Sequence, residues 1–105
     1  ISTTGLRSKS WEEFATPDAH VLAFNFTDCA HEAKEVCPLW PGHPMTATWG
    51  VADPAASQGN REQIEKAYRD AFFTLERRIR LFLNLPLASL DGLAIKREMD
   101  NIGRQ

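Results

Sequence analysis

Residues 21–54 read VLAFNFTDCAHEAKEVCPLWPGHPMTATWGVADP and contain both candidate strands of the chain. The first, Val21 to Thr27, is an apolar run of residues that favour strands, without the 3.6-residue spacing of a helix, so we expect burial on both faces for much of its length. The second, Met45 to Val51, ends at the Asp53-Pro54 break. About seventeen residues separate the two runs. This length predicts parallel strands, because an antiparallel hairpin needs only two to five residues.

A long helix is the clearest element downstream. Asn60 and Gln63 have the spacing of a capping box, and Pro86 ends the pattern. Apolar residues recur three and four positions apart, which predicts one buried face: Ile64, Tyr68, Ala71, Phe72, Leu75, Ile79 and Phe82. The arginines near its end, Arg77, Arg78 and Arg80, are interpreted as part of a solvated face rather than an anion site.

Two further helical segments are expected. One runs from about Ser89 to Ile102, where Gly103 is placed to end it. The other is a single turn at Trp11–Phe14, with Ser10 and Glu13 at the spacing of a capping box. The three tryptophans, Trp11, Trp40 and Trp49, are interpreted as packing groups.

These patterns predict an α/β fold with two parallel strands and two C-terminal helices. We expect one partial domain over residues 1–105: a loop with a helical turn (1–19), strands with their crossover and the Asp-Pro loop (20–57), and a helical region (60–103). Two strands cannot cover the apolar face of a helix of about 25 residues. The expectation is therefore either an additional N-terminal segment or a homo-oligomer that buries the open edge.

Composition narrows the classes of partner. Twelve Lys and Arg against fourteen Asp and Glu give a net charge of −2, so no excess positive charge is present to neutralise nucleic acid. The longest strongly apolar stretch, residues 81–90, is short of the roughly 20 residues that span a membrane. The first residues, Ile1 to Gly5, lack the features of a secretory signal and the chain has no initiating Met, so we expect a cut or processed end and a cytoplasmic protein.

The candidate chemistry lies where the strands end. Cys29 follows the first strand and Asp53 follows the second. Because reactive groups of parallel sheets gather at the carboxyl ends of strands, we expect this thiol and this carboxylate at one edge. The alternative is a buried structural cysteine and an aspartate that only caps a turn.

A second thiol, Cys37, lies eight residues after Cys29. On an intact helix their Cα atoms would be about 12 Å apart, whereas a disulfide requires roughly 4.4–6.8 Å. The two can bond only if the segment is looped or unwinds, as a reversible dithiol would require. Zinc ligation by Cys29, His31, Cys37 and His43 is the weaker alternative, because the spacing does not match common zinc motifs; no metal or other cofactor is otherwise implied.

Three segments in this order resemble the thioredoxin-coupled arsenate reductases, which share the fold of the low-molecular-weight protein tyrosine phosphatases. They are GLRSKSWEEF (5–14), Cys29 through EVCPLWPG (35–42), and WGVADPAA (49–56). The resemblance implies the C-terminal part of such a domain. The family's phosphate-binding loop, Cys-x5-Arg, does not occur in the 105 residues.

The resemblance also implies a function: oxidoreductase chemistry in arsenic detoxification. A loop cysteine attacks arsenate, the thiol matching Cys29 attacks the adduct, and the thiol matching Cys37 captures it as an intramolecular disulfide that thioredoxin reduces. Asp53 would be the general acid. The alternatives are a phosphatase-like fragment that binds a phosphate-like oxyanion, and a non-catalytic module that dimerises through its long helix.

Overall fold

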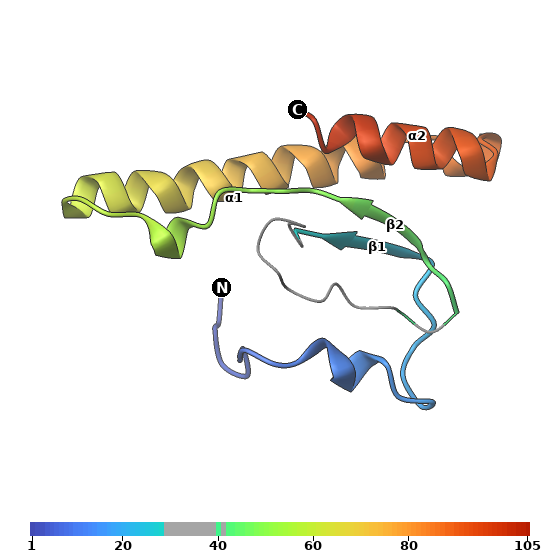
Figure 1. Cartoon of the computed structure of the whole chain (residues 1–105), viewed down its shortest axis with the longest axis horizontal. Helices are drawn as coiled ribbons and strands as arrows, with labels where there is room; N and C mark the ends of the chain where they lie inside the picture. Colours follow the sequence, from blue (N-terminus) through green and yellow to red (C-terminus); the bar gives the residue numbers. More distant parts are fainter. Residues whose placement is uncertain (29–39, 41) are drawn as a thin grey trace.

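The described part of the chain forms a small α/β structure with a two-stranded parallel sheet and two α-helices (Figure 1). The computed structural model describes residues 1–28, 40 and 42–105. Its elements in chain order are η1 (Trp11–Phe14), β1 (Phe24–Thr27), β2 (Met45–Thr48), η3 (Pro54–Ala56), α1 (Arg61–Leu83), η4 (Leu87–Ser89) and α2 (Gly92–Ile102). None of the helices described is long and apolar enough to cross a membrane.

The two strands pair in parallel, as the length of their connection predicted. Phe24 lies opposite Met45 and Thr27 lies opposite Thr48. The ladder continues past the strand ends, since the Trp49 amide donates to the Thr27 carbonyl over 2.7 Å. Both strands are shorter than expected, with four residues each.

The prediction that the first strand is buried on both faces is wrong. All four residues of β1 are only half-buried. Phe24 and Phe26 contact the Phe82 ring of α1, with centroids 5.2 and 4.8 Å apart. Side chains alternate between the faces of a strand, so Asn25 and Thr27 point to the opposite face. The sheet therefore has an apolar face toward the helices and a polar face away from them.

The helices form where their caps and periodicity predicted. The Asn60 side chain accepts from the Gln63 amide, and the Gln63 side chain accepts from the Asn60 amide, each over 2.9 Å. This capping box starts α1, which ends at Leu83, three residues before Pro86. α2 begins later than expected because Asp91 caps it, accepting from the Ala94 amide over 2.7 Å.

The short N-terminal turn forms without the predicted capping box. Ser10 Oγ accepts from the amide of Glu12, over 3.2 Å, while the Glu13 carboxylate pairs with the guanidinium of Arg7 at 2.5 Å. The turn is a 3-10 helix, whose tighter winding differs from the α-helical turn that the capping-box spacing implies.

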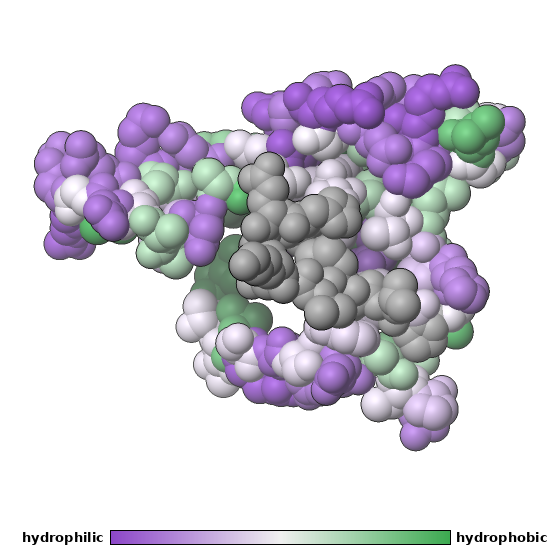
Figure 2. All heavy atoms as spheres, viewed as in Figure 1, coloured by the Kyte–Doolittle hydropathy of each residue, from purple (hydrophilic) through white to green (hydrophobic). Residues whose placement is uncertain are grey.

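The core lies between the apolar face of the sheet and the two helices. Its buried side chains come from β2, the residue after it, and α2: Ala47, Trp49, Ile95, Met99 and Ile102. The Trp49 indole N–H donates to the Met99 carbonyl over 2.9 Å, and its ring lies 4.0 Å from that of Phe26. Figure 2 shows hydrophilic side chains along the outer side of α2, away from this core.

The sheet covers only part of α1. Four residues of strand extend about 13 Å, whereas the 23 residues of α1 extend about 34 Å. The N-terminal half of α1 projects beyond the sheet (Figure 1). The predicted single buried face is consequently wrong for several of its members, which are exposed: Tyr68 52%, Phe72 63%, Leu75 40% and Ile79 50%.

The dimensions of the whole chain reflect this projection. The radius of gyration is 15.9 Å, whereas a compact domain of this length has about 13 Å. The accessible surface is 8560 Å², against about 5,900 Å² for a folded monomer of the same mass. The larger accessible surface accompanies the exposure of the apolar residues of α1.

Candidate functional site

The two strands deliver the chain to one edge of the sheet. Thr27 and Thr48 are paired as the last residues of their strands, and the Trp49 amide bonds to the Thr27 carbonyl. Asp28, the residue before Cys29, is exposed and follows Thr27 directly. Cys29 and Cys37 lie outside the described residues, so the expected approach of these two thiols stays a prediction.

Asp53 lies on the segment that leaves β2 from this edge. Its Oδ1 accepts a hydrogen bond from the Ala55 amide over 2.9 Å, which makes Asp53 the cap of η3. Pro54 follows it, and Asp53 is extended, with φ −69° and ψ 110°, as the residue before a proline prefers. The aspartate therefore caps a turn, as the alternative interpretation held, while its carboxylate group remains exposed at the surface.

A hollow of about 680 Å³ lies between the segment after β2 and α1. Its lining residues include Asp53, Asp70 and Arg78. Figure 1 shows η3 beneath the projecting half of α1, on the side to which both strands run. The hollow is thus bounded by the Asp-Pro segment on one side and by a helix on the other.

Arg78 is the residue that fastens this segment to α1. It is 6% exposed, and its Nη1 donates to the Gly50 carbonyl over 3.1 Å. Its Nε donates to the backbone oxygen of Gln105, also over 3.1 Å. One guanidinium therefore ties the start of the Asp53 segment and the residues that follow α2 to the same helix.

The interpretation of the three arginines as a solvated face is wrong for Arg78. Arg77 and Arg80 are exposed as expected, and Arg80 pairs with Glu76 at 2.8 Å. Arg78 lies seven residues after Ala71, which places both on one face of the helix. Phe72 and Ile79 have the same spacing and are exposed, so no local spacing in the sequence separates Arg78 from its neighbours.

The zinc alternative has no support among the described residues. In residues 1–28, 40 and 42–105 no group of three or more His, Cys, Asp and Glu side chains could hold a metal ion. His43 is exposed and has a positive φ of 51°. The other three candidate ligands, Cys29, His31 and Cys37, lie outside this part of the chain.

Comparison with known proteins found no family model, no curated protein and no solved structure that matches this chain.

Proposed function

We propose that this chain supplies the relay thiols and the general acid of an arsenate reductase with the low-molecular-weight phosphatase fold. The observation that carries the proposal is the parallel pairing of β1 and β2, with Thr27 opposite Thr48. With this topology, both strands end at one edge of the sheet. From there the chain continues into Cys29 after β1 and into the Asp53 segment after β2. The motif resemblance gives the two thiols and the acid their roles.

The proposed reaction moves two electrons from thiols to arsenic. A nucleophilic cysteine thiolate displaces an oxygen of arsenate and forms a sulfur–arsenic(V) bond. The Cys29 thiolate attacks that sulfur, a disulfide forms, and the electron pair of the broken bond leaves with arsenic as arsenite. The Cys37 thiolate then attacks Cys29, which releases the first cysteine as a thiolate and leaves a Cys29–Cys37 disulfide.

Asp53 is proposed as the acid that protonates the oxygen leaving arsenate in the first step. The bond from the Ala55 amide engages its Oδ1, so Oδ2 is the atom to carry the proton. Pro54 and η3 hold the backbone at this position. Arg78, through Gly50, holds the start of the same segment and is a positioning residue in this proposal.

The partners follow from the chemistry. The oxyanion requires a loop of backbone amides at a helix N-terminus, with a nucleophilic cysteine. Because no Cys-x5-Arg sequence occurs in these 105 residues, we propose that another segment supplies this loop. Thioredoxin is the proposed reductant, since its dithiol exchanges with a protein disulfide. The paired thiols favour the reductase over a phosphatase, whose reaction does not need them.

The test is disulfide mapping followed by reduction. After mild oxidation with diamide, we expect peptide mass spectrometry to find Cys29 linked to Cys37 within one chain. Thioredoxin, thioredoxin reductase and NADPH should then restore both thiols with stoichiometric NADPH oxidation. Cys29→Ser and Cys37→Ser are the matched controls and should consume none. Links only between different chains, or an intramolecular link that thioredoxin leaves intact, would overturn the proposal.

A further inference from the structure

A row of exposed apolar side chains on α1 has no part in the proposed redox chemistry. Its members recur three or four residues apart and form what we call the apolar stripe: Tyr68, Phe72, Leu75, Ile79 and Leu83, exposed by 52%, 63%, 40%, 50% and 72%. Such spacing places all five along one side of a helix. Contiguous exposed apolar rows of this kind mark interaction surfaces in proteins.

The stripe continues the face that the sheet covers. Phe82, which packs on Phe24 and Phe26 of β1, lies three residues after Ile79 and is adjacent to it on the helix surface. Tyr68, Phe72, Leu75 and Ile79 alternate spacings of four and three residues, the pattern of a helix-pairing seam. This spacing favours another helix as the partner that covers the stripe.

Charges beside the stripe identify the orientation of that helix. Next to the stripe, on the side of α1 away from Arg78, lie Glu65 and Arg69 in the first half of the helix and Glu76 and Arg80 in the second half. If a second copy of α1 lies antiparallel, the central apolar layer pairs Phe72 with Leu75 of the other copy. Arg69 then lies near Glu76 of the other copy, and Glu65 near Arg80. By two-fold symmetry each of these opposite-charge pairs occurs twice.

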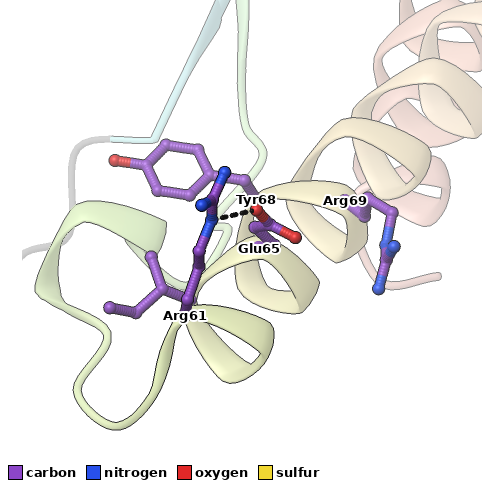
Figure 3. A pocket seen from close by; sticks show the side chains of 5 residues that line it. Arg61, Glu65, Tyr68 and Arg69 are labelled. Atoms are coloured by element: carbon purple, nitrogen blue, oxygen red, sulfur yellow. Dashed lines mark hydrogen bonds and ion pairs between the residues drawn. The ribbon is translucent and has the colours of Figure 1, made fainter.

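A hollow at the N-terminal end of α1 fits the same arrangement. Its lining is Arg61, Ile64, Glu65, Tyr68 and Arg69, and its volume is about 700 Å³. Figure 3 shows the Arg61–Glu65 ion pair beside Tyr68, with Arg69 projecting separately from the helix. In the antiparallel arrangement the layer outside Tyr68 pairs Ile64 with Leu83 of the other copy. Ile64 and Tyr68 give the lining of the hollow an apolar part that suits a leucine from a helix end.

We propose that two copies of this chain dimerise through the apolar stripe, with their α1 helices antiparallel. The charge pattern is the reason for proposing a second copy as the partner. Both members of each opposite-charge pair between the two copies come from α1. The large accessible surface of the single chain, 8560 Å², is consistent with a subunit that buries a further face. This inference is independent of the proposed redox chemistry, since it uses no residue of the thiol relay.

The test is sedimentation equilibrium of the full chain and of variants in the stripe. We expect the mass of a dimer, and the mass of a monomer for Phe72→Glu. The matched control is Leu93→Glu, because Leu93 is an exposed apolar residue, at 71%, that lies on α2 and outside the stripe. Circular dichroism establishes that each variant keeps its helices. A chain that is monomeric over the whole concentration range would overturn the proposal and leave a further chain segment or a different protein as the occupant.

Charge reversal tests the pairing itself without removing an apolar contact. Arg69→Glu and Glu76→Arg should each weaken dimerisation about tenfold at low salt, because both copies then hold like charges at two places. The double variant should recover most of that loss. Arg77→Glu, an exposed reversal on the other side of α1, should leave the dimer unchanged. If the losses of dimer affinity in the two single variants add up in the double variant, the antiparallel arrangement is wrong.

Discussion

Trp49 joins the sheet to α2 with a single buried side chain. Its indole N–H donates to the Met99 carbonyl over 2.9 Å, and its ring packs on Phe26. Trp49→Phe keeps an aromatic ring but removes the donor. We expect a loss of about 1–2 kcal/mol in unfolding free energy, from the lost hydrogen bond and the smaller ring. Urea denaturation measures it, and an unchanged midpoint would show that this bond contributes nothing.

Arg78 holds two backbone segments that are distant in the sequence. Arg78→Met keeps a long apolar side chain and removes both donors, to Gly50 and Gln105. We expect about 2–3 kcal/mol of destabilisation, because hydrogen bonds from a charged group are lost. The control is Arg77→Ala, an exposed neighbour, with a change within about 0.5 kcal/mol. Equal effects of the two substitutions would contradict the role assigned to Arg78.

The Arg7–Glu13 pair provides a pH-dependent contact at the N-terminal turn. The hydrogen bond from Arg7 lowers the pKa of the Glu13 carboxyl below its usual value of 4.5, with a smaller contribution from Lys9. Because the pKa is lowered in the folded chain, this contact stabilises the turn above the ordinary pKa and is lost as pH falls through the lowered value. NMR titration should find the low pKa in the wild type and an ordinary one in Arg7→Ala. An unshifted Glu13 in the wild type would contradict the pairing.

Phe82 joins α1 to the sheet through its aromatic ring. Phe82→Ala removes ring contacts with both Phe24 and Phe26. We expect a loss of about 2–3 kcal/mol, below the full range for Phe because the residue is half-buried. Phe73→Ala, on the exposed part of the same helix, is the control. Comparable losses for both variants would mean that the sheet does not anchor α1 through Phe82.

Local signals predicted the elements well. The seventeen-residue connection identified parallel strands, and the Asn60–Gln63 spacing located the start of α1. Burial was predicted less well, because the same apolar periodicity describes a covered face and an exposed one. Tyr68 and Phe82 share the pattern, yet only Phe82 contacts the sheet. The sheet contacts Phe82 and not Tyr68 because its strands are short. Strand length depends on pairing between distant segments, which no local pattern contains.

For the candidate site, the sequence predicted the edge of the sheet at which the described strands end. Strand topology indicated that the chain leaves β1 and β2 at one edge, and Thr27 opposite Thr48 confirms it. The part played by Arg78 was not predictable from its neighbours, because its acceptors are 27 and 28 residues away in sequence. For Cys29 and Cys37 the sequence-based prediction still stands as made.

In the whole molecule, the hollow beside Asp53 and the apolar stripe use different sides of the same helix, α1. The Asp-Pro segment lies against α1 on the side of Arg78, while the apolar stripe lies on the free side. No residue of the stripe lines that hollow, so dimerisation through the stripe uses a different part of α1 from the Asp53 segment. The two proposals are therefore compatible and can be tested separately.

The midpoint potential of the Cys29–Cys37 pair shows whether these two thiols form a dithiol that thioredoxin can reduce. The chain is equilibrated in graded mixtures of reduced and oxidised glutathione, and the thiols are trapped and counted by mass spectrometry. We expect a single two-electron transition at or above the thioredoxin potential of about −270 mV, with Cys37→Ser showing none. No intramolecular disulfide at any ratio, or a transition below about −300 mV as in structural disulfides, would show that Cys29 and Cys37 are not such a dithiol.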